Sequence, residues 1–312
     1  MSAEKSITIV IVNWNSGKQL KDCVDSINKY GAPFVEKIVV VDNGSTDGSA
    51  ESVEFLSDVV LVRANANIGF GSASNQGAKE ANTEYLLFLN PDAYLYQQSL
   101  PNVMQFMRDD ANRQTGICGI QLVDEQGHVA RSCARFPSAK EFIAHATGLS
   151  HLLGTKKVSM ADWDHGSTRE VDHVIGAFFL VRRSVFDAVG GFDERFFLYL
   201  EDLDFSRQAK YLGWNSTYFA DAQAFHAGGG TSRQVKAKRL FYSLRSRIIY
   251  GFKHFDRSSA MLLAITTLCV EPFARLALAL ATCSVSSLIE TLKGYSYLWR
   301  WLPQYVFFGK TR

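Results

Sequence analysis

The sequence predicts an α/β protein with a mostly parallel sheet flanked by helices in residues 1–250 and a helical region in residues 251–312. Three observations predict this fold. Short apolar runs that do not alternate with polar residues recur in the first half of the chain, as in strands covered on both faces. Segments with apolar residues at helical spacing separate these runs. The connections are short, as in parallel strands joined by right-handed crossovers.

The first strand and helix open the chain. Residues 6–12 form an apolar run that ends at Asn13. Ser16, with Gln19 three positions later, predicts a capping box at the start of a helix. Gly31 predicts the end of that helix.

The same order of elements then repeats. Residues 37–41 predict a second strand, and residues 53–56 predict a short helix after a loop rich in Gly, Ser and Asp. Residues 59–62 predict a third strand, and residues 72–81 a helix of small side chains. The fourth strand is predicted at residues 86–89.

The end of this fourth strand carries the first candidate site. Pro91 cannot donate to a sheet and restricts the residue before it, so the strand should end at Asn90. Asn90 and Asp92 are therefore expected on the loop at the carboxyl edge of the sheet, where open α/β sheets bind ligands. Their oxygen atoms can face one hard cation such as Mg²⁺ or Mn²⁺. The alternative is a strand followed by a Pro-Asp turn without a ligand.

The remaining elements of the domain are predicted farther along the chain. Residues 124–170 are polar and weakly patterned, and they predict loops over the ligand edge of the sheet. The predicted elements are a helix at 98–109, strands at 116–123, 174–181 and 216–219, and a helix at 202–212.

Polar loops follow three of the predicted strands, at residues 13–15, 42–48 and 65–71. Backbone N–H groups and carboxylates gathered at one sheet edge suit a nucleotide. No G-x-G-x-x-G follows the first strand and no G-x-x-x-x-G-K-[ST] occurs, so the dinucleotide-binding and P-loop classes are excluded. Asp42 suits a hydrogen bond to a base or a ribose hydroxyl, and a turn with a helix cap is the alternative.

Acidic residues and a histidine mark the last part of the predicted domain. Glu201, Asp202 and Asp204 stand at a predicted helix start, where acids complement the helix dipole or one carboxylate serves as a general base. His226 precedes three glycines, which predict a mobile loop able to close over a ligand. His226 is a candidate third ligand for a cation near Asp92, and a histidine beside a flexible hinge is the alternative.

The ordered set of these motifs resembles glycosyltransferase family 2, over roughly residues 6–250. Within that family the chain looks most similar to bacterial rhamnosyltransferase-type enzymes of cell-surface polysaccharide synthesis. The motifs that carry the resemblance are Val12-Asn13-Trp14-Asn15, Val41-Asp42-Asn43-Gly44-Ser45-Thr46-Asp47, Asn67-Ile68-Gly69-Phe70, Asn75-Gln76-Gly77, Asn90-Pro91-Asp92, Gly176-Ala177, Gly190-Gly191-Phe192-Asp193-Glu194, Tyr199-Leu200-Glu201-Asp202-Leu203-Asp204 and His226.

The resemblance implies a GT-A fold, an inverting transfer from a nucleotide-diphosphate sugar, and a divalent cation, Mg²⁺ or Mn²⁺. It implies that Asp202 is the catalytic base and that Glu201 contacts the acceptor. Asn90 departs from the family pattern because an amide stands where a carboxylate of the metal motif is expected. The residues implied to bind the nucleotide sugar are Val12, Asn13, Asn15, Asp42, Asn67, Gly69, Asn75, Asn90 and Asp92, and those implied to hold the cation are Asp92, Asn90 and His226.

Composition narrows the class of protein further. A formal net charge of +2 and a pI near 8.2 do not indicate a nucleic-acid-binding protein. The five cysteines are scattered and form no C-x-x-C pair, so neither a zinc site nor a disulfide framework is predicted. No basic-then-apolar signal sequence opens the chain. We therefore expect a cytoplasmic protein.

The C-terminal region contains two apolar runs, residues 261–270 and 276–289, with Glu271, Pro272 and Arg275 between them. Neither run reaches the roughly 20 residues that a spanning helix needs. We therefore expect helices that lie in the membrane interface, on the cytoplasmic face of the inner membrane. Aromatic and basic residues near the end of the chain are typical of such an interface. The alternative is a helical cap on the catalytic domain or a dimer interface.

The predicted function is transfer of a sugar to a saccharide or lipid-linked saccharide acceptor, with dTDP-L-rhamnose as the donor that the resemblance implies. A UDP-hexose or UDP-N-acetylhexosamine donor stays open, as do the acceptor, the linkage and whether the chain forms a homo-oligomer. Two other classes are weighed. For a nucleotidyltransferase of related fold, residues 13–18 are a poor match to the expected loop. A catalytically silent sugar-binding protein is favoured by Asn90 but opposed by Asp202 and His226.

Overall fold

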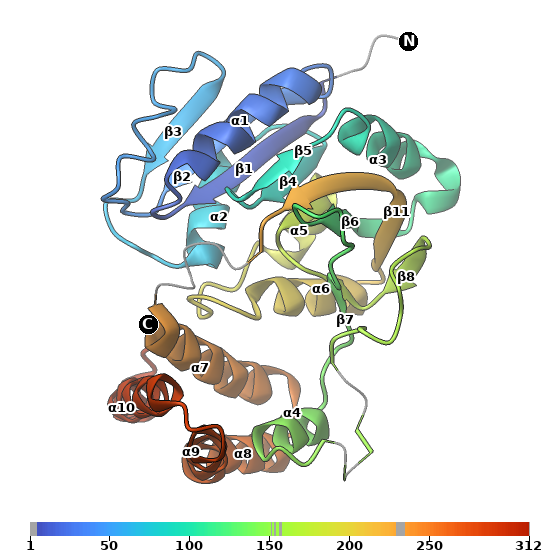
Figure 1. Ribbon diagram of the computed structural model, residues 1–312. Helices are drawn as coiled ribbons and strands as arrows, with labels where there is room; N and C mark the ends of the chain where they lie inside the picture. The colour runs from blue at the N-terminus through green and yellow to red at the C-terminus, as the bar shows by residue number, and fades with distance from the viewer. Residues whose placement is uncertain (1–4, 151, 153, 156–157, 229–234, 312) are drawn as a thin grey trace. The chain divides into compact units, whose positions relative to one another are not determined.

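The computed structural model describes residues 5–150, 152, 154–155, 158–228 and 235–311 (Figure 1). The chain divides into two compact units. The first, called here the sheet unit, comprises Met1–Arg135, Ser159–Glu194 and Glu201–Thr231. The second, called the helical unit, comprises Phe136–Val158, Arg195–Leu200 and Ser232–Arg312.

The sheet unit is built on a mixed sheet that has nine strands within the described residues. The strand order is β3-β2-β1-β4-β10-β6-β11-β5, and β8 pairs with β11. The strands are β1 (Ile7–Asn13), β2 (Val35–Asp42), β3 (Val59–Arg63), β4 (Tyr85–Leu89), β5 (Ala93–Leu95), β6 (Thr115–Val123), β8 (Arg169–Val171), β10 (Phe178–Arg182) and β11 (Asn215–His226).

The first four strands of this order are parallel, as the apolar runs predict. Their register places Asn13 beside Asp42, and Asp42 beside Arg63, so the carboxyl ends of these strands coincide. β10 is antiparallel to β4 and β6, so the sheet is mixed beyond its first half. The polar strand ends therefore meet at one edge, where a parallel sheet binds its ligands.

The strand predicted at residues 174–181 is in fact two short strands. β9 (His173–Val174) pairs with β7 (Cys133–Ala134) in a separate two-stranded sheet, and β10 begins only at Phe178. The chain turns between them at Gly176 and Ala177. The periodicity of apolar residues did not reveal this break, because both halves are buried.

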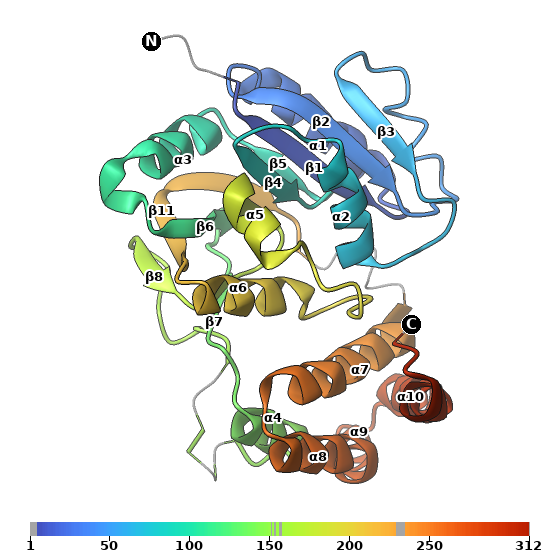
Figure 2. The same cartoon turned by 180° about the vertical axis from the view of Figure 1, so that it is seen from behind.

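Helices cover both faces of the sheet (Figures 1 and 2). α1 (Lys18–Tyr30) and α3 (Ser99–Arg108) bury their apolar sides against one face, together with alternate residues of β1 such as Ile9. α2 (Phe70–Lys79), α5 (Arg183–Val189) and α6 (Glu201–Tyr211) pack on the other face, where Val10 points. Side chains of a strand alternate between faces, so each parallel strand contributes to two cores.

Two local predictions in this unit are wrong. The capping box at Ser16 does not form: α1 begins after Gly17, and the Ser16 hydroxyl donates to the Asn13 side chain instead. Residues 53–56 form turns rather than a helix, because the N–H groups of Ser52, Val53 and Glu54 bond to carbonyls three residues earlier instead of four.

The helical unit contains five α-helices and one π-helical turn within the described residues. Residues 124–170 were predicted to form loops, but they include one of these helices, which a capping box between Ser138 and Glu141 initiates. The elements are α4 (Ala139–Ala146), α7 (Lys236–His254), α8 (Arg257–Ile265), the π turn η3 (Thr266–Val270), α9 (Glu271–Ala281) and α10 (Val285–Phe308).

α8, η3 and α9 form one continuous helical segment, Arg257–Ala281, where the sequence predicted two runs separated by polar residues. Glu271 does not interrupt the helix because it is buried and pairs with Arg247 of α7 and with Arg275. Pro272 stands in the first turn of α9, just after the π turn, where a missing N–H is tolerated. Within the described residues, this segment is the one that is long and apolar enough to cross a membrane by length and composition.

Candidate functional site

Asn13, the last residue of β1, is the centre of the first polar network at the sheet edge. Its side chain is fully buried, and its Nδ2 lies 3.1 Å from Asp42 Oδ1, 3.0 Å from Ser45 Oγ and 2.9 Å from Ser49 Oγ. Its Oδ1 accepts a hydrogen bond from Ser16. Because both ends of the amide are engaged, Asn13 holds the loop after β2 against the end of β1. Ser45 and Ser49 were not among the predicted site residues.

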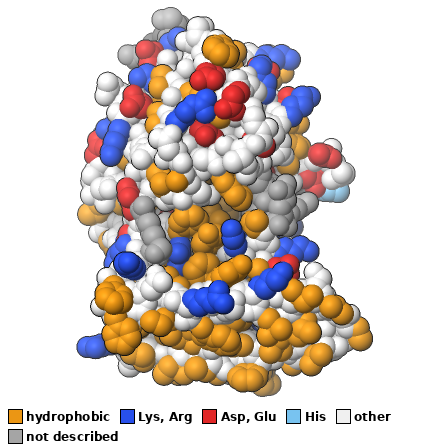
Figure 3. All heavy atoms as spheres, turned by 90° about the vertical axis from the view of Figure 1, so that its left-hand side faces the viewer, with side chains coloured by type: hydrophobic (Ala, Val, Ile, Leu, Met, Phe, Trp, Pro, Cys, Tyr) orange, Lys and Arg blue, Asp and Glu red, His pale blue; other side chains and the backbone are white. Residues whose placement is uncertain are grey.

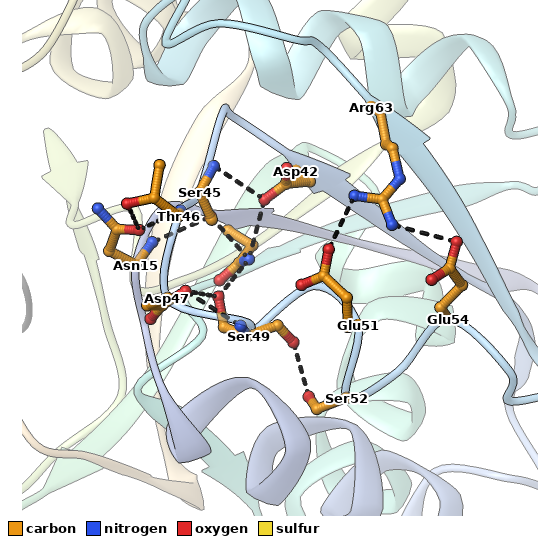
Figure 4. A network of polar contacts seen from close by, with 11 residues as sticks. Asn15, Asp42, Ser45, Thr46, Asp47, Ser49, Glu51, Ser52, Glu54 and Arg63 are labelled. Carbon is orange, nitrogen blue, oxygen red and sulfur yellow. Dashed lines mark hydrogen bonds and ion pairs between the residues drawn. The ribbon is translucent and has the colours of Figure 1, made fainter.

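The loop after β1 is tied to the same network (Figure 4). Asn15, in the left-handed region with φ 51°, donates its N–H to Ser45 Oγ at 3.0 Å and accepts the Thr46 N–H at Oδ1, 2.7 Å away. Asp47 accepts the Gly17 N–H at 2.8 Å. Burial is the largest single influence and raises the pKa of Asp47, but the hydrogen bonds from Ser49 and Gly17 together outweigh it and lower the pKa. The ends of β1 and β2 thus form one polar ledge.

Asn43 joins the loops after β2 and β3, and sequence reasoning missed it. Its Oδ1 accepts the Ile68 N–H at 2.8 Å, and its Nδ2 donates to Asn67 Oδ1 at 3.2 Å. Asn67 Oδ1 also accepts the Gly69 N–H at 3.1 Å. The loops are so close that a Cβ on Gly44, whose φ is +77°, would lie 2.9 Å from the Ala66 carbonyl carbon. Only a glycine allows the two backbones to approach this closely, so Gly44 is the sequence feature that could have indicated the contact between these loops.

Two predicted nucleotide-binding residues have engaged or buried side chains. Val12 is buried in the core between the sheet and the helices α2, α5 and α6. Asn75, on α2, binds the backbone of Phe192 with both ends of its amide, at 2.8 Å and 2.9 Å. A Cβ on Gly191 would lie 2.7 Å from Asn75 Oδ1, so this turn fits closely against α2. The structure therefore shows Val12 packing the core and Asn75 fixing a loop.

Asn90, Asp92 and His226 come together at the ends of β4 and β11. His226 Nε2 lies 3.3 Å from Asp92 Oδ1 and 3.4 Å from Asn90 Nδ2. The pairing of β5 with β11 places His226 opposite Ala93, and Ala227 donates its N–H to the Asp92 carbonyl. This pairing, which the sequence did not predict, brings His226 from far along the chain to the edge of the sheet.

The residue types of this trio suit a divalent cation. A carboxylate oxygen, an amide oxygen and an imidazole nitrogen are ligands that Mn²⁺ accepts, and the oxygens also suit Mg²⁺. Among the described residues, no group of three or more His, Cys, Asp and Glu side chains could hold a metal. The candidate site therefore consists of Asp92, His226 and the Asn90 amide. Three protein ligands leave coordination positions for ligand oxygens and water.

Asp202, at the start of α6, has its carboxylate fixed on several sides. Oδ2 accepts the Gly176 N–H at 2.9 Å and lies 3.6 Å from His173 Nε2, and Oδ1 accepts the Leu203 N–H at 2.8 Å. Burial by itself would raise the pKa of Asp202, but the charge of His173 and these hydrogen bonds outweigh it and lower the pKa. The side chain is 21% exposed, so an ionised carboxylate reaches solvent here.

Glu201, next to Asp202 in sequence, has the opposite character. Its side chain is buried against α2, where a Cβ on Gly71 would lie 3.6 Å from Glu201 Cβ. Burial and the charge of Asp202 raise its pKa well above the usual value. Adjacent carboxyl groups whose environments push their pKa values apart are typical of a division between a neutral acid and an ionised base.

One turn connects the Asp202 carboxylate to the cation ligands. Gly176 donates its N–H to Asp202, and the next residue, Ala177, accepts the Asn90 N–H at its carbonyl, 3.1 Å away. The turn between β9 and β10 therefore binds a candidate base on one side and the strand end of the candidate cation site on the other. The glycine-rich residues that follow His226 lie largely outside the described part of the chain, which omits 229–234.

The fold and this edge indicate a class of protein: an α/β enzyme with a polar ledge suited to a nucleotide, a candidate cation site and a candidate carboxylate base. The family model described as "Glycosyl transferase family 2" matches residues 8–190, which is more than half of the chain. The protein belongs to glycosyl transferase family 2 and is a glycosyltransferase.

Curated relatives of this chain include enzymes named as rhamnosyltransferases. The chain is 27% identical over 266 residues to the N-acetylglucosaminyl-diphospho-decaprenol L-rhamnosyltransferase of Mycobacterium tuberculosis, covering 78% of this chain and 83% of the relative. It is 24% identical over 269 residues to the rhamnosyltransferase WbbL of Escherichia coli, covering 82% of this chain and 98% of the relative.

Solved structures show the GT-A fold. The mannosyltransferase PcManGT of Pyrobaculum calidifontis, solved with GDP-Man and Mn²⁺, matches with a TM-score of 0.53 and 17% identity, covering 98% of this chain and 84% of that one. TarS of S. aureus, residues 1–349, matches with a TM-score of 0.53 and 16% identity, covering 94% and 78%.

Proposed function

We propose that this glycosyltransferase is an inverting enzyme that moves L-rhamnose from dTDP-rhamnose to a lipid-linked saccharide during the synthesis of a cell-surface polysaccharide. The observation that carries the proposal is the Gly176–Ala177 turn, which binds the Asp202 carboxylate and the strand end at Asn90 at once. One turn thus holds both the proposed base and the proposed site of the departing diphosphate. This arrangement suits a reaction in which the acceptor hydroxyl attacks, and the diphosphate leaves, the same sugar carbon. The names of the relatives from M. tuberculosis and E. coli support rhamnose as the sugar.

The polar ledge at the ends of β1 and β2 is the proposed nucleotide site. We propose that Asp42 and Asn15 face the base and ribose, and that Asn67 and Gly69 line the other side. The buried Asn13 amide, which hydrogen-bonds Asp42, sets the position of that carboxylate rather than meeting the ligand itself. Val12 and Asn75 contribute by packing the core and by holding the Phe192 turn.

Asp202 is the proposed general base. As the acceptor hydroxyl attacks the anomeric carbon, its proton moves to the Asp202 carboxylate, and the bond from that carbon to the diphosphate breaks on the opposite face. The lowered pKa keeps Asp202 ionised for this step. Glu201 is buried, so we propose that it acts on its neighbour Asp202 rather than on the acceptor.

Asp92, His226 and Asn90 are proposed to hold a divalent cation. When bound, such a cation neutralises the negative charge that develops on the departing diphosphate. PcManGT and GalNAc-T7 were solved with Mn²⁺, which supports a cation here, and we propose that Mn²⁺ or Mg²⁺ serves. With an amide in place of one carboxylate, Asp92 Oδ1 and His226 Nε2 are the principal donors.

The helical unit is proposed to bind the membrane surface, where a lipid-linked acceptor resides. Figure 3 shows hydrophobic side chains gathered in a band on this unit with Lys and Arg side chains beside it. Glu271 is buried and paired with Arg247, and 33% of the most apolar stretch of Arg257–Ala281 is buried, so this segment is better suited to the interface than to crossing the bilayer. The exposed large apolar residues from α8 to α10 are Met261, Leu262, Ile265, Val270, Phe273, Leu278, Leu280, Val285, Ile289, Leu292, Trp299, Val306, Phe307 and Phe308.

Flotation with vesicles tests the membrane proposal. The double variant Phe273→Ser and Leu280→Ser removes side chains that are 72% and 67% exposed, and we expect it to lose binding to vesicles that contain anionic lipid. Phe55→Ser is the matched control, because Phe55 is 91% exposed on the sheet unit. Wild-type protein that fails to float with any vesicle, or a double variant that floats as well as wild type, would overturn the interfacial proposal.

Donor turnover tests the proposed function. Purified protein is assayed with dTDP- and UDP-sugars, with Mg²⁺, Mn²⁺ or EDTA, and with a membrane lipid extract as the acceptor source. We expect acceptor-dependent release of dTDP from dTDP-rhamnose, loss of the signal in EDTA, and a fall of about 10²-fold or more in D202N with dTDP binding retained. Full activity of D202N would remove it as the base. Tight binding of nucleotide sugar without any turnover would favour a silent binding protein.

A further inference from the structure

His173 is buried beside the proposed base, and nothing in the sequence analysis singled it out. It is 4% exposed and lies on β9, whose other residue is the apolar Val174. Its Nε2 is 3.6 Å from Asp202 Oδ2, and its Nδ1 is 3.0 Å from Ser206 Oγ, one helical turn after Asp202 on α6. Both ring nitrogens therefore face α6: Nε2 faces the Asp202 carboxylate, and Nδ1 faces the Ser206 hydroxyl.

The hydrogen bonds of Ser206 decide how the ring is oriented. The Ser206 hydroxyl donates to the Asp202 backbone carbonyl at 3.0 Å, so its oxygen has lone pairs and no second proton to offer. His173 Nδ1 must therefore donate to Ser206 Oγ. With Nδ1 donating to Ser206, Nε2 is the ring nitrogen that faces the Asp202 carboxylate. When the ring carries a second proton, that proton lies on Nε2 and faces the negatively charged Asp202 carboxylate.

We propose that His173 is a positioning residue that orients the Asp202 carboxylate through its Nε2 and sets the pH dependence of the base. The inference rests on the proposed function of Asp202 as the base. Gly176 N–H binds the same Oδ2 from the turn, and Leu203 N–H binds Oδ1, so two backbone donors fix the carboxylate and the ring faces it at ion-pair distance. The charge of His173 is the largest influence that lowers the pKa of Asp202 against its burial.

The neighbouring groups leave this role to His173. Burial and the charge of Asp202 raise the pKa of Glu201, so as the pH rises Glu201 loses its proton after Asp202 does and adds no competing charge where Asp202 begins to ionise. The facing parts of α2 and α5 contribute Gly71 and the Phe186 ring, which carry no charge. The other titratable or charged groups on the elements packed against the pair are Lys79 on α2, Arg183 and Asp187 on α5, Asp204, Arg207, Lys210 and Tyr211 on α6, Cys133 on β7, Asp172 before β9, and Tyr218, Asp221 and His226 on β11.

The pH profile of kcat/KM for donor and acceptor tests the proposal. His173→Gln keeps an amide donor near the position of Nε2 but cannot become positively charged. The acidic limb of the kcat/KM profile reports the ionisation of the base in the free enzyme, and in the His173→Gln variant it should therefore move to higher pH. We expect a severalfold loss at pH 6 that shrinks toward pH 8.5, with dTDP affinity unchanged. His128→Gln is the control, because His128 is exposed on the same unit, and it should leave the profile in place.

A loss by the same factor at every pH would overturn the proposal, because a histidine that only packs β9 against α6 would act that way. Nuclear magnetic resonance of the ring nitrogens gives a second readout that needs neither activity nor a stable His173 variant. The His173 ring signals should change in D202N, and unchanged signals would refute the coupling. Absence of turnover in wild-type protein with every donor would refute the proposed function instead, while the ring signals would still decide whether the pair is coupled.

Discussion

Removal of the Asn13 amide is the sharpest test of how the fold builds the nucleotide ledge. Asn13→Ala leaves Ser16 without its acceptor and takes a donor from the buried Asp42 carboxylate, as well as from Ser45 and Ser49. Hydrogen bonds between neutral groups contribute about 1 kcal/mol each, and those to charged groups about 2 kcal/mol. Two amide protons and one acceptor are lost together, so we expect a fall of about 3–5 kcal/mol in the free energy of unfolding of the sheet unit.

That loss is a large fraction of the roughly 5–15 kcal/mol by which domains are usually stable. Equilibrium unfolding in urea, followed by circular dichroism and tryptophan fluorescence, measures it. Thr46→Ala is the matched control: Thr46 is exposed on the same loop and its hydroxyl makes a hydrogen bond of 3.5 Å to Asn15, so the change should stay within about 0.5 kcal/mol.

Asn13→Asp separates shape from charge. The variant retains an acceptor for Ser16 but places a second carboxylate about where the amide nitrogen now meets Asp42 Oδ1, 3.1 Å away. Like charges at that separation repel, so Asn13→Asp should be less stable than Asn13→Ala at neutral pH and should recover as the pH falls. If Asn13→Ala unfolds within 1 kcal/mol of wild type, the network does not hold the ledge and the reasoning fails.

Three further predictions concern other parts of the molecule. The raised pKa of Glu201 means that the folded state keeps a proton that the unfolded chain releases, so the melting temperature of wild type should fall as pH rises above the ordinary carboxyl pKa. Glu201→Gln should abolish that slope in melting curves between pH 4.5 and 8. Gly77→Ala would place a Cβ 2.4 Å from Val10 Cγ1, which should cost about 1–3 kcal/mol in urea unfolding, and an unchanged midpoint would contradict the close packing of α2 on β1. Glu271→Ala should destabilise the helical unit by about 3–5 kcal/mol, because Arg247 stays buried without its partner, and hydrogen exchange in α7 and α9 would detect it.

The parallel half of the sheet could be predicted from the sequence because its strands are buried on both faces and its helices follow at regular spacing. The positions of Asn90, Asp92 and Asp42 at strand ends followed from Pro91 and from the ends of the apolar runs. The break between β9 and β10 could not be predicted, because apolar residues on both sides hide a turn that only backbone hydrogen bonding reveals.

Long-range pairing decided the rest of the site. His226 reaches Asp92 because β11 pairs with β5, and His173 reaches Asp202 because β9 packs against α6. Neither contact leaves a local pattern, since its partners are separated by tens of residues and each side chain alone resembles an ordinary buried or surface residue. Sequence by itself determined the family, the strand ends and the carboxylates at Asp92 and Asp202. The tertiary structure decided which carboxylate is ionised, because burial, donors and neighbouring charge exist only once the chain has folded.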